Sequence, residues 1–129
     1  SPPPPLQLIV TLLIGAGAKV DLARTVDGAT PLYIAAANGN GEIVTLLIRA
    51  GANVDLALND GQSPLFAASE EGHAAIAELL IQAGARVNSR VVDPSPIDPN
   101  CSGLTALGIA RKNGCDGVVA VLLQHGAEE

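Results

Sequence analysis

Residues 27–59 read DGATPLYIAAANGNGEIVTLLIRAGANVDLALN, and residues 60–88 continue with DGQSPLFAASEEGHAAIAELLIQAGARVN. The two stretches match at a constant offset of 33 residues. For example, the Asp-Gly pair at 27–28 returns at 60–61. A sequence that repeats itself at a fixed interval is typical of proteins built by stacking one small unit. The interval therefore decides the fold.

A quartet of mainly apolar positions extends this repeat in both directions. In the first full copy the quartet is Ile43, Leu46, Leu47 and Ala50, which has the i, i+3, i+4, i+7 spacing of one helix face. The quartet recurs as Ile9, Leu12, Leu13 and Ala16, as Ile76, Leu79, Leu80 and Ala83, and as Val118, Val121, Leu122 and His125. The offsets are 34, 33 and 42 residues, so the chain holds four copies and the last follows an insertion of nine residues.

The residues at the turn points predict two short helices in each copy. Thr30 can cap a helix N-terminus with its hydroxyl, and Pro31 then falls at the first helical position, where a missing N–H costs nothing. Ser63-Pro64 repeats this pair. Gly39 and Gly51 are placed to end the two helices of the first full copy in the left-handed conformation that glycine adopts easily.

The period of 33 residues, the Thr-Pro-Leu triplet and the Gly-Ala endings resemble the ankyrin repeat, which consists of two short helices and a β-turn. The resemblance implies an all-α solenoid of stacked helix-turn-helix units with β-turn or hairpin fingers, and seven helices. It also implies one domain over 1–129, comprising a half repeat at 6–25, repeats at 26–58, 59–90 and 101–127, and a Pro-rich inserted finger loop at about 91–100.

Composition narrows the functional class. The chain is 48% hydrophobic with one Phe, one Tyr and no Trp, which suits closely packed helices with small side chains. Its net charge of -6 lacks the positive footprint that nucleic acids require, so we expect no nucleic-acid partner and no membrane insertion. Cys101 and Cys115 have neither C-x-x-C spacing nor a secretory framework, which favours free thiols in an intracellular (cytoplasmic or nuclear) protein.

The chain departs from the ankyrin motif at the position that follows Thr-Pro-Leu, where the family usually has His. Tyr33, Phe66 and Gly108 stand there instead. Two interpretations stay open for the aromatic pair: altered packing beside the turn, or aromatic anchors at a binding face. His73 and His125 fall where ankyrin repeats commonly carry His, and we expect structural roles for both because no second ligand lies at metal spacing.

Ankyrin proteins generally bind partners on the concave face formed by turn tips and first helices, so the resemblance implies a protein-interaction module and no enzyme. No catalytic, cofactor or metal site is expected. Carried over by register, the partner-binding residues are Asp27, Ala29, Tyr33, Asn38, Asn59, Asp60, Gln62, Phe66, Glu70, Glu71, Leu104, Lys112 and Asn113. Asp60, Glu70 and Glu71 are expected to form a solvated acidic patch with no Lys or Arg nearby.

Several alternatives remain open. The chain could be a regulatory or targeting segment of a larger enzyme or effector whose catalytic domain is absent, or a self-assembling array. The first helix is apolar almost all round, and SPPPP at 1–5 stands where its partner helix should be. This fits a piece of a longer array, self-association through that uncapped helix, or a helix covered by another segment. The insertion is either a tolerated loop extension or a finger that touches the partner.

Overall fold

The computed structural model describes residues 20–23 and 27–128. These ranges contain the α-helices α2 (Pro31–Asn38), α3 (Gly41–Arg49), α4 (Pro64–Glu70), α5 (Ala74–Gln82), α6 (Ala106–Lys112) and α7 (Asp116–Gln124), and the 3-10 helix η1 (Pro99–Cys101). They contain no strand. The seventh expected helix, in the half repeat, and its proposed self-association lie outside the described residues. Within these ranges, no helix combines the length and the apolarity needed to cross a bilayer.

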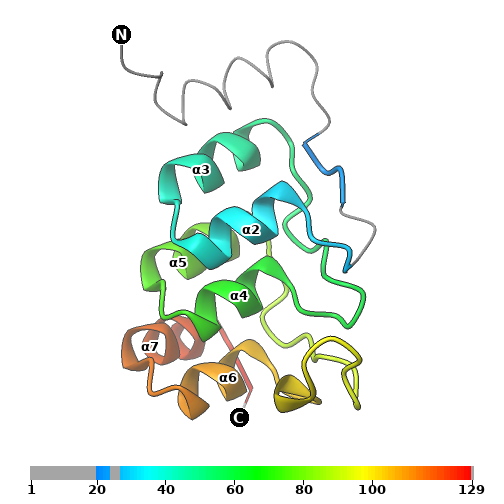
Figure 1. The fold of residues 1–129 in the computed structure, drawn as a ribbon. Coiled ribbons are helices and arrows are strands. Elements are labelled where there is room, and N and C mark those ends of the chain that lie inside the picture. The colour runs from blue at the N-terminus through cyan, green and yellow to red at the C-terminus, as the bar shows by residue number, and fades with distance from the viewer. Residues whose placement is uncertain (1–19, 24–26, 129) are drawn as a thin grey trace, which may run out of the picture.

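The helices form two stacked layers (Figure 1). Helices α2, α4 and α6 pack on one another as an inner layer, while α3, α5 and α7 form the outer layer behind it. Each inner helix also packs against the outer helix that follows it in the chain. The long loops that join one copy to the next all lie on the same side of the stack, to the right in Figure 1. This arrangement is the solenoid that the repeat predicts.

The predicted capping chemistry explains where the inner helices begin and end. A side-chain hydroxyl accepts the backbone N–H three residues later, at 3.2 Å for Thr30, 3.1 Å for Ser63 and 3.1 Å for Thr105. Gly39 ends α2 with φ 78°. A Cβ at Gly39 would lie 2.8 Å from the His73 ring, so this turn requires glycine for both conformation and space.

The core consists of small and branched aliphatic side chains shared between neighbouring copies. Ala35, Ala68 and Ala110 occupy the same register position of the three inner helices and are buried. Their small side chains allow the inner helices to approach closely. In the outer layer, Leu47 and Leu80 are buried at the quartet position that faces inward. One continuous cluster of such residues runs through all three copies, so no copy has a separate core.

The loops between copies are hairpin-like turns that contact one another. The backbone N–H of Asn59 donates to the carbonyl of Asp27, one copy earlier, at 2.8 Å. One period later the N–H of Val92 donates to the carbonyl of Asp60 at 2.7 Å. The repeat register is therefore maintained as far as Val92. The additional residues come after Val92 in the chain.

Candidate functional site

The structure divides the thirteen residues predicted to contact a partner by their exposure. Asn38, Asn59, Glu71, Lys112 and Asn113 are exposed, and Asp27, Tyr33, Glu70 and Leu104 are half-buried. The remaining four are buried, with exposed fractions of 2% for Ala29, 0% for Asp60, 4% for Gln62 and 2% for Phe66. These four side chains are buried in the described structure, which does not fit the direct contact predicted for them.

Asp60 is buried because the insertion folds over it. Its Oδ1 accepts the backbone N–H of Gln62 at 3.0 Å, and its Oδ2 accepts the Gln62 side-chain amide at 2.8 Å and the Ser95 hydroxyl. The Ser95 oxygen in turn accepts the backbone N–H groups of Ile97 and Asp98 at 3.3 Å and 2.9 Å. Asp60 therefore organises the insertion instead of belonging to a solvated acidic patch.

The two aromatic residues serve packing and hydrogen bonding between copies. The Tyr33 hydroxyl donates to Oε1 of Gln62 at 3.2 Å, which joins α2 to the turn before α4. Burial, reinforced by the charges of Glu70 and Asp60, raises the pKa of Tyr33, so its hydroxyl remains a donor. Phe66 lies in a second, smaller core cluster that it shares with Ile109. For Phe66 the interpretation as an exposed anchor is wrong.

Glu70 and the insertion share a cluster of three polar side chains. The Cys101 thiol lies 3.4 Å from Oε2 of Glu70 and 3.1 Å from Oδ2 of Asp98. Burial, together with these two carboxylates, raises the pKa of Cys101 to about 12, so the thiol is protonated and the two carboxylates share its single S–H donor. Burial likewise raises the pKa of Glu70, against the lowering effect of the Cys101 hydrogen bond.

The ligand atoms of these three side chains lie within 4.8 Å of one another, close enough to be compared with a metal site. A thiol ligates a metal as the thiolate, which this environment disfavours. Hydrogen bonding within the cluster accounts for its arrangement. We assign it a structural role, in which it holds η1 against the end of α4.

The predicted acidic patch is smaller and less acidic than expected. Asp60 is removed from it by burial. Lys112 lies near Glu70 and lowers its pKa, although less than burial raises it. The side-chain amide of Asn113 donates to the Glu70 carbonyl at 3.0 Å. Glu71 is the one member of the expected trio that is exposed.

Three of the five exposed residues form a row of polar side chains along the inner layer. Asn38, Glu71 and Asn113 occupy the same register position at the C-terminal ends of α2, α4 and α6, and all three are exposed. They follow one another down the stack in the order of the helices shown in Figure 1. We call these three residues the inner-helix row.

The insertion adds apolar surface that the register analysis missed. Val92 and Ile97 are 51% and 39% exposed. The Lys112 ammonium donates to the carbonyl of Asn100 at 2.9 Å, which joins the insertion to the end of α6. Val92 occupies the register position of the polar residue Asn59, and Ile97 lies among the additional residues, so the repeat pattern did not indicate apolar surface here.

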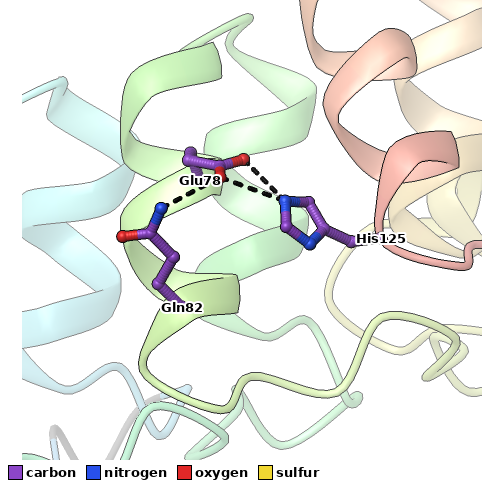
Figure 2. A network of polar contacts seen from close by, with 3 residues as sticks. All are labelled: Glu78, Gln82 and His125. Atoms are coloured by element: carbon purple, nitrogen blue, oxygen red, sulfur yellow. Dashed lines mark hydrogen bonds and ion pairs between the residues drawn. The ribbon is translucent and has the colours of Figure 1, made fainter.

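The outer layer carries a separate polar network (Figure 2). Nε2 of His125 lies 2.9 Å and 3.0 Å from the two carboxylate oxygens of Glu78. The side-chain amide of Gln82 donates to the same carboxylate at 3.0 Å. The network joins α5 to the end of α7, which fits the structural role expected of His125.

A family model described as "Ankyrin repeats (3 copies)" matches residues 6–91, about two thirds of the chain. Helices α6 and α7 lie beyond the matched residues, yet they repeat the Thr cap and the stacking of the earlier copies. No curated protein matches the chain.

Proposed function

Because the chain belongs to the ankyrin repeat family, we propose that it binds another protein through the face formed by its loop tips and inner helices. Ankyrin repeats are generally protein-interaction modules and are typically not catalytic. Membership of the family supports protein binding in general, whereas the binding face and the kind of partner are proposed here.

The inner-helix row is the observation that carries the proposal. Asn38, Glu71 and Asn113 are exposed at one register position in three successive copies, whereas the neighbouring positions Ala35, Ala68 and Ala110 are buried. A stack that repeats exposed polar side chains at a fixed interval offers regularly spaced contacts to one extended partner surface.

The insertion supplies the apolar part of the same surface. Val92 and Ile97 are the exposed apolar side chains of a segment that is held in place at Asp60 and at Lys112. Side chains of a segment that is already held in place lose little conformational freedom on binding, which lowers the entropic cost of the contact. We therefore propose a partner with an apolar patch that meets the insertion and polar groups that meet the row.

The proposal is tested with two sets of substitutions that change the net charge equally. The partner is first identified by cross-linking the wild-type chain in lysate from the cells that express it, followed by mass spectrometry. The row set is Asn38→Arg, Glu71→Arg and Asn113→Arg. The outer-helix set is Glu42→Arg, Ala75→Arg and Ala120→Arg, all at exposed positions.

We expect the row set to weaken partner binding at least tenfold and the outer-helix set to leave it within about twofold of wild type. Circular dichroism melting of both sets checks that the fold is retained. The opposite result, loss of binding in the outer-helix set alone, would place the partner on the outer layer and contradict the proposed face.

A further inference from the structure

Most of the serine and threonine hydroxyls that the structure describes are used within the fold. Those of Thr30, Ser63 and Thr105 cap the inner helices, and all three residues are buried. Four further hydroxyls make hydrogen bonds inside the fold, and none of these residues is exposed: Thr45, Ser69, Ser95 and Ser102. These seven side chains serve the structure.

Ser89 is the exception among the described Ser and Thr residues. It is exposed, and its hydroxyl makes no hydrogen bond to any residue that the structure describes. The same register position holds Leu22 and Leu56 in the two preceding copies, with exposed fractions of 67% and 36%. The position therefore faces solvent in three successive copies, and at Ser89 it carries a nucleophilic hydroxyl.

Positive charge stands on both sides of Ser89 in the sequence. Arg86 precedes it by three residues, and Arg90 follows it directly. Both residues are exposed, and the side chain of Arg86 is 80% exposed, with its Nε 3.9 Å from Oδ2 of Asp55. No other described Ser or Thr has a Lys or Arg within three residues on either side. In a chain of net charge -6, exposure and positive charge thus coincide at one hydroxyl.

The backbone around Ser89 is accessible to an enzyme. Residues 85–90 follow α5 and belong to neither a helix nor a strand. Two hydrogen bonds hold them: the N–H of Arg86 donates to Oδ1 of Asp55 at 2.8 Å, and Oδ1 of Asn88 accepts the N–H of Glu128 at 2.8 Å. Both bonds are exposed, and local opening at such places requires little free energy.

We propose that Ser89 is a phosphorylation site for a Ser/Thr kinase whose acidic substrate groove binds Arg three residues before the acceptor. The Ser89 oxygen attacks the γ-phosphorus of Mg·ATP, and the bond from that phosphorus to the β,γ-bridging oxygen breaks. ADP leaves, and the hydroxyl proton passes to the catalytic Asp of the kinase. The phosphoserine carries about 1.5–2 negative charges at neutral pH, which offset the two positive charges of Arg86 and Arg90.

The test uses two substrates for one purified kinase that requires Arg at the third residue before the acceptor. One is the folded full chain, and the other is a synthetic peptide of residues 83–93, AGARVNSRVVD. After incubation with Mg·ATP, mass spectrometry locates the phosphate and measures its amount. We expect phosphorylation of both substrates at Ser89, and Ser89→Ala should abolish it in this segment of the chain.

Two matched substitutions test the role of the arginine. Arg86→Gln is expected to lower the initial rate of Ser89 phosphorylation at least tenfold. Arg49→Gln is the control, because it removes an exposed Arg from α3, and the rate should stay within about twofold of wild type. Arg86→Gln made in the peptide alone should have the same effect as in the chain, so the result does not depend on the folding of a variant.

Three results would overturn the proposal. One is phosphorylation of the peptide without phosphorylation of Ser89 in the folded chain, which would mean that the fold blocks access. Another is the absence of phosphate at Ser89 in both substrates. The third is an equal rate for Arg86→Gln and wild type, because the arginine would then not direct the kinase. All measurements use the chain without its partner, so they succeed or fail independently of the proposed binding face.

Discussion

The Ser95 hydroxyl donates a hydrogen bond to Oδ2 of Asp60, which lies 35 residues earlier in the chain and is 0% exposed. This bond joins the insertion to the turn of the preceding copy. It also helps to bury Asp60. In a chain without the insertion, the same register position would lie at a turn tip.

Replacing Asp60 with Ala should lower the free energy of unfolding by about 1–3 kcal/mol, because the Gln62 amide and the Ser95 hydroxyl would lose their buried acceptor. Urea titration followed by circular dichroism measures the change. The control is Asn59→Ala at the exposed neighbouring position, where a change within about 0.5 kcal/mol is expected. Equal stabilities of the two variants would show that Asp60 is not buried.

Leu80→Ala should lower the free energy of unfolding by about 2–5 kcal/mol, since Leu80 is 0% exposed in the shared core and its truncation leaves a cavity. Leu123→Ala truncates the same side chain at a position that is 42% exposed, and it should cost much less. Denaturant midpoints of both variants are compared with wild type. An unchanged midpoint for Leu80→Ala would mean that the helical register is wrong.

The two cysteines should differ in reactivity toward a thiol reagent. Cys101 is buried with its pKa raised to about 12, whereas Cys115 is half-buried. Because the thiolate is the reactive form, we expect labelling of native protein at pH 8 to modify Cys115 first. Peptide mass spectrometry identifies the labelled residue, and titration of the denatured, unreduced chain should count two thiols. Faster labelling of Cys101 would contradict its burial.

Stability should fall as the pH rises above about 9. The folded chain holds the Cys101 proton up to a pKa of about 12, while an unperturbed cysteine has a pKa of 9.0. Burial raises the pKa of Tyr33 in the same direction. In both cases the unfolded chain releases its proton first, so the stabilisation is complete below the unfolded pKa and is lost as pH rises toward the folded one.

Urea titrations at pH 8, 9 and 10 test this dependence. Cys101→Ala should be less stable than wild type at pH 8, because it removes a buried side chain, and its stability should decline less steeply with pH. A wild-type free energy of unfolding that stays constant or increases between pH 8 and 10 would be the contrary result.

Local chemistry made most of the fold predictable. The hydroxyl of Thr30, followed by Pro31, fixes the start of an inner helix, and Gly39 fixes its end, so short stretches of sequence already specify these elements. Repetition of the same residues at a 33-residue interval then gives the stacking, because each copy needs its neighbour to bury its apolar face.

Solvent exposure at the candidate site was harder to predict than backbone position. The register places Asp60 and Phe66 correctly near the inner layer, but it says nothing about what covers them. Both are covered by residues of the insertion, which interrupts the period and therefore has no counterpart in the other copies. Contacts made by a segment that occurs once cannot be inferred from a pattern that repeats.

The base of the insertion has a consequence for how this stack could be altered. In the short turn, the N–H of Leu58 donates to the carbonyl of Gln62 at 2.9 Å. In the long one, the N–H of Val91 donates to the carbonyl of Leu104, also at 2.9 Å. The same backbone pair closes both turns, so the nine additional residues do not change the distance that the chain must cover from α5 to α6. Loop length at this point is independent of the spacing between copies, and segments of other lengths could be exchanged there while the helices above and below keep their positions.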